Sequence, residues 1–459
     1  MLPPIHELQA SLSRPGSHQA LIERVLSEAA APAAAHVFTA LFADEALAAA
    51  RAADAQFARG EPLPPLAGLP VSVKDLYDIT GRTTLAGSVL RRGAPPAGRD
   101  AAAVARLRQA GAAIVGTTHM TEFAFSGVGI NPHNGTPRNP ADPLLARIPG
   151  GSSSGAAVSV ALGLAVAGLG SDTAGSIRIP AALCGLVGFK NTQNRTPLQG
   201  AYPLSFTLDT ACAMARCVAD CLVVDAVLAG AALPPAPRST SGVKGLRLAL
   251  PQTLLLDELE PAVARAFERA LQRLAAAGAV VTELPLAELA EIAQINAPGG
   301  FSPVEAYALH REALRTQRDR FDPRVAARIA LGEGVSAADY IVMQQRRRDW
   351  IARVGQRLQG FDAVVCPTVP ITAPPIADLV ASDDAFFHAN ALLLRNTFVA
   401  NFLDGCAFTL PCHAPGELPV GLMLTAPGGR DAELAAVALA VEAALSSPRE
   451  APPQHRPGA

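Results

Sequence analysis

Lysine is scarce in this chain of 459 residues. Only three lysines, Lys74, Lys190 and Lys244, stand against 35 arginines. Acidic and basic residues nearly balance, at 40 and 38, and the formal net charge is −2. This balance excludes the strongly basic surface that attracts nucleic acid or anionic membranes. Because positive charge has gone almost entirely to arginine, each lysine is a candidate for a specific role.

Aromatic residues and long apolar runs are scarce as well. Half of the residues are apolar but only 5% are aromatic, so small side chains must fill much of a sizeable core. The longest apolar stretch, Ala156 to Leu169, is shorter than the roughly 20 residues that a bilayer requires. No basic stretch followed by an apolar run opens the chain, so no secretion signal is predicted. These absences predict a cytoplasmic protein that has no membrane partner.

The chain also lacks the spacings that hold metals. Its seven cysteines form no CxxC pair and no Cys/His zinc pattern. Cys217 and Cys221 lie four residues apart, which is typical of buried thiols on one helix face. We therefore expect neither a metal nor an organic cofactor.

Apolar strands alternate with amphipathic helices along the chain. This alternation, with buried β-branched strands, indicates an α/β sandwich with a largely parallel sheet. The expected strands are 69–73, 113–115, 246–250, 280–284, 363–366 and 420–424, and the expected helices are 101–110, 156–167, 261–277 and 431–445.

The organisation predicts one domain over residues 1–459. Its parts are N-terminal helices in 1–65, a core in 66–232, the second half of the sheet in 243–446 with a helical cap near 303–359, and a flexible tail over 447–459. The Pro- and Ser-rich segment 233–242 is the one plausible linker.

Two Gly/Ser-rich loops lie at 149–155 and 170–178, on either side of a helix of small residues. Consecutive backbone N–H groups in such loops form a nest for an anion. A hydroxyl nucleophile beside such a nest is what acyl transfer requires, because the developing oxyanion needs fixed donors. The sequence therefore predicts a serine nucleophile in this segment.

A serine nucleophile needs a base, and Lys74 is a candidate. None of the nine histidines pairs with the two loops by position. Lys74 ends a buried strand, and burial lowers the pKa of a lysine until its amine can accept a proton. The alternative is a strand-end lysine that faces solvent.

Four motifs are long enough to identify a family: GLPVSVKD at 68–75, GGSSSG at 150–155, GSDTAGSIRIP at 170–180 and LCGLVGFK at 183–190. With them the chain resembles the amidase signature family over most of its length, and it is similar to small bacterial members near the carboxybiuret-type hydrolases. The resemblance implies an α/β/α sandwich with a large, mostly parallel mixed central sheet.

The resemblance also implies roles for residues. Ser176 would be the nucleophile, Ser152 the bridging serine after a cis Gly151–Ser152 bond, and Lys74 the base. The backbone N–H groups of the oxyanion hole would belong to Thr173, Ala174, Gly175 and Ser176, the substrate-binding residues would be Met120, Thr121, Gly151 and Ser153, and Asp172 and Arg178 would support the loop.

The implied reaction is hydrolysis of the C–N bond of a small amide through a seryl acyl-enzyme, without a cofactor. Carbamates (urethanes) and esters lie within reach of the same chemistry. Family members are often dimers, so a homodimer is an open expectation. The alternative function is the amidase-like subunit of a tRNA-dependent glutamine amidotransferase, which would accompany partner subunits.

Four positions depart from the family pattern and two short motifs compete with it. Ser154 and Ala174 stand where glycine is frequent, and Asn191 and Asn194 alter the loop at 190–195, so the shapes of these loops are open. Residues 151–155 also fit G-x-S-x-G, but no core strand is expected before them. Residues 241–244 fit S-x-x-K without a following helix, which indicates a chance match.

Overall fold

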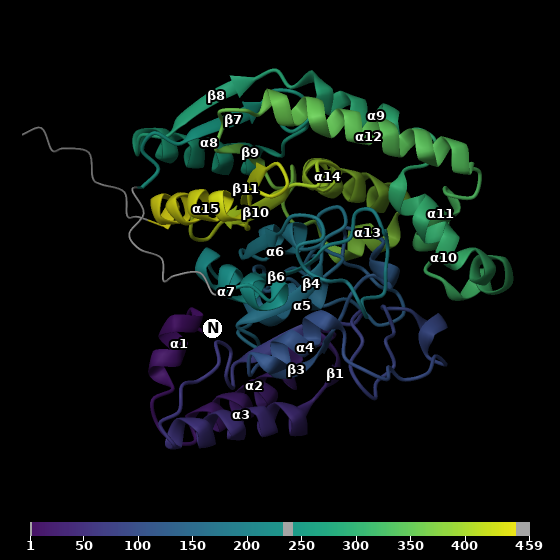
Figure 1. Cartoon of the computed structure of the whole chain (residues 1–459). Coiled ribbons are helices and arrows are strands. Elements are labelled where there is room, and N and C mark those ends of the chain that lie inside the picture. Colours follow the sequence, from purple (N-terminus) through teal and green to yellow (C-terminus); the bar gives the residue numbers. More distant parts are fainter. Residues whose placement is uncertain (1, 233–241, 447–459) are drawn as a thin grey trace, which may run out of the picture.

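The computed structural model describes residues 2–232 and 242–446, and one mixed sheet of 11 strands runs through them (Figure 1). The strands are β1 (Phe38–Leu41), β2 (Pro70–Lys74), β3 (Ala113–Thr118), β4 (Ala167–Ser171), β5 (Val187–Lys190), β6 (Ala211–Ala215), β7 (Arg247–Pro251), β8 (Val280–Leu284), β9 (Ala363–Pro367), β10 (Cys406–Pro411) and β11 (Gly421–Ala426). Their order across the sheet is β1-β3-β2-β4-β6-β5-β10-β11-β9-β7-β8.

Helices make up most of the remaining described chain. They are α1 (Ile5–Ser11), α2 (Ser17–Ala29), α3 (Ala43–Ala58), α4 (Ala102–Gln109), α5 (Ser154–Ala161), α6 (Arg178–Leu183), α7 (Val218–Ala229), α8 (Pro261–Ala276), α9 (Glu291–Asn296), α10 (Phe301–Gln317), α11 (Pro323–Ala330), α12 (Ala337–Arg357), α13 (Ile376–Ala381), α14 (Asp383–Phe402) and α15 (Asp431–Ser446).

The helices cover both faces of the sheet. Every residue of β2, β4 and β6 is buried, and a strand can be buried throughout only when both faces are covered. Helices α5, α6 and α14 contact one another as one group, and α4, α7, α15 and α8 form another. The predicted α/β fold with a large mixed sheet and flanking helices is confirmed.

Parallel pairing is concentrated in two blocks of the sheet. Strands β3, β2 and β4 run parallel, as do β9, β7 and β8. Between the blocks, β6, β5, β10 and β11 pair antiparallel, and β1 lies antiparallel to β3 at the edge. The carboxyl ends of β2 and β4 are therefore neighbours, and this places the residues that follow them at one edge of the sheet.

The predicted strands with β-branched residues are all present within one or two residues of their expected ends, except that β3 continues to Thr118. The expected helix 156–167 is too long, because α5 ends at Ala161 and the chain re-enters the sheet at Ala167. Five strands were not expected: β1, β4, β5, β6 and β10. Runs of glycine, alanine and cysteine in β4 and β6 lack the side-chain periodicity that marks a strand.

The segment near 303–359 is helical, as expected for the cap. Helices α10, α11 and α12 occupy it, at the right and top of the view in Figure 1. The expected linker, apart from Gly242, and the expected tail lie outside the described residues. None of the described helices is long and apolar enough to cross a bilayer.

Candidate active site

Lys74 joins the two predicted loops through its ammonium group. It is the last residue of β2, and its side chain is fully buried. Lys74 Nζ lies 2.7 Å from Ser152 Oγ and 2.8 Å from Ser171 Oγ, and it donates a hydrogen bond to each. The alternative of a strand-end Lys74 in solvent is therefore wrong.

The surroundings of Lys74 change its acid–base chemistry. Burial disfavours the ammonium form and lowers the pKa of Lys74 to about 7, although the nearby carboxylates of Asp209 and Asp172 oppose this shift. An amine with this pKa is neutral in a substantial fraction of molecules at neutral pH. It can therefore accept a proton from a neighbouring hydroxyl.

Ser152 is held by the loop that precedes α5. The Gly151–Ser152 peptide bond is cis, as the resemblance implied. The N–H of Gly151 donates to the carbonyl of Gly127 at 2.8 Å, and the carbonyl of Ser152 accepts from Thr121 N–H at 3.3 Å. A side chain at position 151 would meet the backbone of Gly129 at 2.8 Å, so only glycine fits there.

Ser176 lines the wall of a cavity of about 430 Å³. Its carbonyl accepts a hydrogen bond from Ser153 N–H at 3.3 Å, which ties the two Gly/Ser loops together. The Ser176 hydroxyl forms no hydrogen bond with any other residue that the structure describes. Ser176 is thus the one member of the predicted triad whose hydroxyl is left to meet a ligand.

Three of the four predicted oxyanion donors have a free backbone N–H group. In the described chain, the N–H groups of Thr173, Ala174 and Ser176 make no hydrogen bond, and all three residues line the same cavity. The N–H of Gly175 instead donates to Asp172 Oδ1 at 2.9 Å. Gly175 is therefore committed to shaping the loop, and the donor set narrows to the other three residues.

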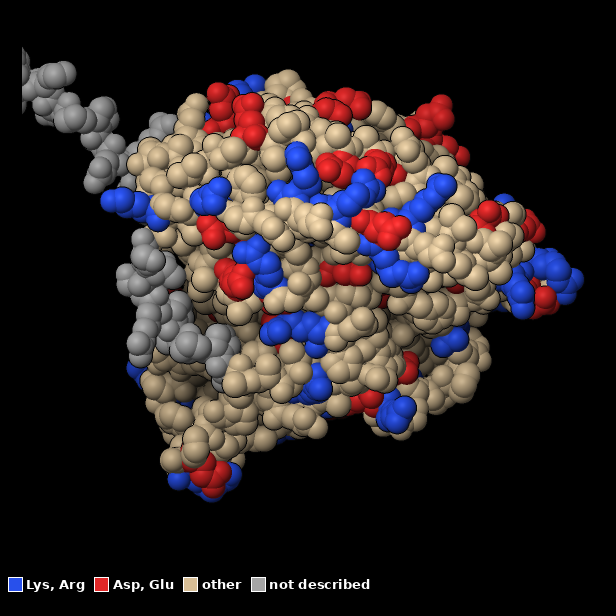
Figure 2. All heavy atoms as spheres, turned by 45° about the horizontal axis from the view of Figure 1, so that its top comes forward, with Lys and Arg blue, Asp and Glu red and all other residues tan. Residues whose placement is uncertain are grey.

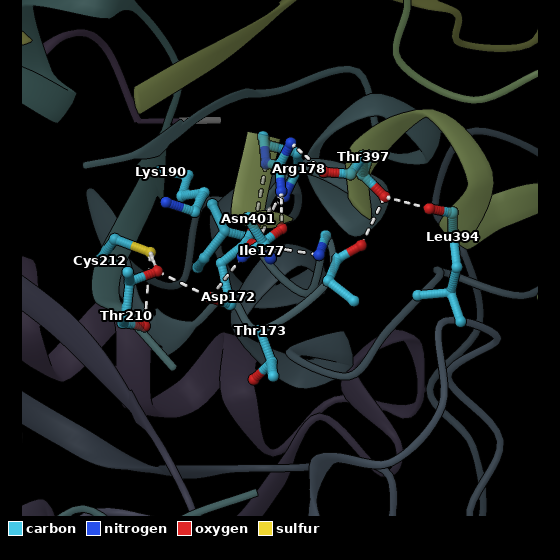
Figure 3. A network of polar contacts seen from close by, with 12 residues as sticks. Asp172, Thr173, Ile177, Arg178, Lys190, Thr210, Cys212, Leu394, Thr397 and Asn401 are labelled. Carbon is cyan, nitrogen blue, oxygen red and sulfur yellow. Dashed lines mark hydrogen bonds and ion pairs between the residues drawn. The ribbon is translucent and has the colours of Figure 1, made fainter. Parts of the chain in front are cut away.

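A buried ion pair holds the loop from behind (Figure 3). Arg178 donates from Nε to Asp172 Oδ2 at 3.0 Å and from Nη2 to Asp172 Oδ1 at 2.8 Å. Arg178 also donates to the carbonyl of Thr397 and to Asn401 Oδ1, and Asn401 donates back to Asp172. The predicted support residues are thus brought together, and α14 supplies the rest of the network.

The charges in this network are fixed at neutral pH. Burial alone would raise the pKa of Asp172, but the Arg178 guanidinium and the Lys190 ammonium outweigh it and lower that pKa to about 2. Lys190 itself donates to the carbonyls of Asn191 and Gly405, at 2.9 and 2.6 Å. Lys190 is therefore a buried structural cation, whereas Lys244 is exposed.

The predicted substrate-binding residues are close to the serines but do not line the cavity. The backbone N–H groups of Thr121 and Ser153 bind the carbonyls of Ser152 and Ser176. Met120 is buried, and its carbonyl accepts a hydrogen bond from Asn131. The cavity walls come instead from Ala124–Ser126, Thr173, Ala174, Ser176, Leu204, Leu254, Leu289, Ala290, Ile292, Ala293, Asn296, Gly299–Pro303, Arg328, Ala391, Leu394, Arg395 and Phe398.

The four departures from the family pattern fit their places. The Ser154 hydroxyl donates to the carbonyl of Gly129, and the carbonyl of Ala174 accepts from Thr397 Oγ1 at 2.6 Å. Asn191 donates to Thr196, to the carbonyl of Ala211 and to Asp225. Asn194 has a φ of 64°, a left-handed conformation that asparagine tolerates better than most residues.

Sequence reasoning missed Ser171 and the arginines of the cavity. Ser171 was visible as a polar residue in the GSDTAGS motif, but its contact with Lys74 depends on the pairing of β2 with β4. Arg328 and Arg395 come from α11 and α14, far along the chain, and no local signal marks them. In the parts of the chain that the structure describes, no three His, Cys, Asp or Glu side chains gather as metal ligands.

Comparison with known proteins gives a consistent result. The Amidase family model matches residues 20–435. The 2-amino-5-chloromuconic acid deaminase of Comamonas testosteroni is 41% identical, over 87% of this chain and 86% of the deaminase. AtzE, which belongs to the 1-carboxybiuret hydrolase of Pseudomonas sp. strain ADP, is 36% identical, over 85% of this chain and 87% of that protein.

The glutamyl-tRNA(Gln) amidotransferase of Acidothermus cellulolyticus also has a similar component, which is 36% identical over 91% of this chain and 88% of its own length. This identity is below that to the deaminase. Among solved structures, a crystal structure of an amidase superposes with a TM-score of 0.85 at 33% identity, and covers 96% of this chain and 99% of its own.

Proposed function

Because this chain belongs to the amidase family and hydrolyses carbon–nitrogen bonds of small amides, we propose that it does so through Ser176, Ser152 and Lys74. The observation that carries this proposal is the pair of contacts from the buried Lys74 amine to the hydroxyls of Ser152 and Ser171. Few arrangements other than proton transfer explain a buried lysine that faces only hydroxyl groups.

In the first step, the neutral amine of Lys74 takes a proton from Ser152. Ser152 in turn takes the proton of Ser176, and Ser176 Oγ attacks the amide carbonyl. The oxyanion that forms is bound by the free N–H groups of the 173–176 loop. When the C–N bond breaks, the proton returns through Ser152 to the leaving nitrogen, and an acyl ester remains on Ser176.

In the second step, water attacks the acyl ester. Lys74 and Ser152 again take the proton, and the Ser176–acyl bond breaks to release a carboxylic acid. The Asp172–Arg178 pair takes no part in proton transfer, because its low carboxyl pKa keeps both charges fixed. Its role is to hold the loop so that the N–H groups point into the cavity.

The substrate we propose is a small molecule, because the cavity of about 430 Å³ is of the size that holds one. The names of two relatives refer to 2-amino-5-chloromuconic acid and 1-carboxybiuret, so both compounds belong in a substrate panel. Carbamates and esters belong there too, since the same acyl-enzyme forms from them. L-glutamine tests the alternative, a component of an amidotransferase.

The decisive experiment compares wild type with Ser176→Ala on this panel. We expect the variant to lose at least about 10³-fold in kcat/KM on every substrate that wild type turns over. Ser205→Ala is a matched control, because Ser205 is also buried but bonds to Glu305. Full activity in Ser176→Ala would reject the proposed nucleophile.

We also propose that the protein is a cytoplasmic homodimer of a bacterium that acts without nucleic acid or membrane. Light scattering of the purified chain measures the first of these properties. A monomer, or co-purification with other subunits, would favour a different assembly, such as that of an amidotransferase.

A further inference from the structure

The cavity beside Ser176 is lined by two arginines and, among the described residues, by no acidic side chain. We propose that Arg328 and Arg395 bind a carboxylate of the substrate, so that the preferred substrates are small amides bearing a carboxylate on a short apolar body. This substrate class belongs to the active site proposed above and rests on that function.

Arg328 has an unmet hydrogen-bonding demand. It lies on α11, and its Nη1 atom is buried but has no hydrogen-bond partner in the described chain. The guanidinium stacks on the ring of Phe125, 4.7 Å from the ring centre, and burial lowers the pKa of Arg328 to about 10. A buried donor without an acceptor costs free energy, so its retention beside a cavity points to a ligand that supplies the acceptor.

Arg395 lies on α14 and bonds only to neutral acceptors. Its Nε donates to Asn396 Oδ1 at 3.0 Å, and its Nη2 donates to the carbonyl of Asp257 at 2.6 Å. These contacts fix the orientation of the side chain but leave its charge without a carboxylate partner within 4.0 Å in the described chain. Arg395 therefore adds positive potential to the cavity.

Other arginines with buried or half-buried side chains show the contrast. Arg178 pairs with Asp172, Arg347 with Asp404, and Arg324 with Asp383. Arg324 precedes Arg328 by one turn of the same helix. Within the described residues, the two arginines at the cavity thus differ from these three in lacking an acidic partner.

The rest of the cavity wall decides what kind of anion fits. It is mostly apolar, with Leu289, Ile292, Phe301, Leu394 and Phe398 among its residues. A short hydrocarbon body would bury against these side chains, while its carboxylate meets the guanidinium groups and its amide carbonyl meets Ser176. Arginine binds carboxylates through two parallel hydrogen bonds, which also orients the substrate.

The first test measures turnover of matched substrates. Succinamic, glutaramic and adipamic acids are compared with the same amides in which an isopropyl group replaces the carboxyl group. We expect wild type to prefer the acids, and Arg328→Met to lose about 30- to 100-fold in kcat/KM on them while changing less than about threefold on the neutral amides. Arg324→Met, the matched control on α11, should leave the preference unchanged.

The second test is independent of turnover. Calorimetry should show that succinate, glutarate or adipate binds wild type and binds Arg328→Met at least about 30-fold more weakly, and Arg328→Lys should restore part of the affinity. The melting temperature of Arg328→Met should equal or exceed that of wild type, because the variant removes an unpaired buried charge. A merely structural role for Arg328 predicts a lower melting temperature instead.

These outcomes separate the two proposals. Loss of all turnover in Ser176→Ala, together with equal losses on acids and neutral amides in Arg328→Met, would overturn the carboxylate site and leave the proposed function intact. Activity retained in Ser176→Ala, with dicarboxylate binding lost in Arg328→Met, would reject the nucleophile and support the carboxylate site. If wild type hydrolyses none of these amides, the binding data alone decide, and failure of wild type to bind any dicarboxylate would overturn the inference.

Discussion

Lys74 shows how one position acquires its chemistry from its neighbours. A lysine at the end of an apolar strand could be identified from the sequence, because the chain contains only three lysines. Its two hydroxyl partners could be named only in part. Ser152 lies in a recognisable motif, whereas Ser171 reaches Lys74 because β2 and β4 are neighbours in the sheet, and a linear sequence does not reveal that pairing.

The pH dependence of the reaction should report the Lys74 amine. With a pKa of about 7, Lys74 is protonated and inactive below neutrality, so kcat/KM should fall about tenfold per pH unit below pH 7 and reach a plateau above it. The measurement uses a neutral amide, whose own charge does not change with pH. A flat profile from pH 5 to 9 would show that Lys74 is not the base.

Ser171 should act as a positioning residue for Lys74. In Ser171→Ala the ammonium form loses one of its two hydrogen bonds, so we expect kcat/KM to fall about tenfold and the acidic limb of the pH profile to move to lower pH. Ser72→Ala is the matched control, because Ser72 is also buried on β2 but bonds to Ser159. A rate loss without a shift of the limb would indicate a structural effect alone.

At the scale of elements, the loop between β4 and α6 brings the site together. The sequence predicted its polar residues and the role of Asp172 and Arg178, but the partners Thr397 and Asn401 come from α14, more than 200 positions later. Likewise, the strands that were missed include β4 and β6, whose small residues carry no periodic pattern. Packing between distant elements, rather than local propensity, decides both features.

Removing the charge of Asp172 should therefore loosen the loop. In Asp172→Asn the fully buried Arg178 loses its counter-charge, and we expect the free energy of unfolding to fall by about 3 kcal/mol or more. Urea denaturation followed by circular dichroism measures this change. Glu291→Gln, which breaks the exposed pair with Arg353, is the control and should leave the midpoint in place.

The carboxyl group that remains charged in wild type also shapes the oxyanion site. Asp172 accepts the Gly175 N–H, and an amide at this position cannot do so equally well from both of its atoms. We expect Asp172→Asn to lose rate as well as stability. An unchanged unfolding midpoint in this variant would mean that the ion pair does not hold the loop.

At the scale of the whole molecule, the cavity is assembled from segments that lie far apart. Residues 124–126, 173–176, 289–303, 328 and 391–398 all contribute to its walls. Because each segment reaches the cavity only through the sheet and its helices, the substrate class could not be predicted from a single motif. On the face in Figure 2, acidic and basic side chains are interspersed, in keeping with the balanced net charge.

Buried acids should give the molecule an unusual dependence of stability on pH. Glu122 accepts hydrogen bonds from Ser88 Oγ and from the backbone N–H of Asp322, both at 2.7 Å, and lies 3.1 Å from His133 Nε2. Burial outweighs these bonds and raises the pKa of Glu122 to about 7. Between its ordinary value of 4.5 and about 7, the folded chain therefore holds a proton that the unfolded chain has released.

The sign follows from this difference in bound protons. As pH rises from 5 to 7, the contribution of Glu122 to the free energy of unfolding falls, by up to about 1.4 kcal/mol per pH unit. Glu122→Gln mimics the protonated acid, so relative to wild type it should gain stability as pH rises, whereas exposed Glu312→Gln should follow the wild-type slope. Denaturation at pH 5.5 and 7.5 and equal ionic strength measures the difference, which includes the neighbouring His133 and Asp322 equally in both proteins. Parallel pH profiles for wild type and Glu122→Gln would mean that Glu122 is ionised in the folded chain.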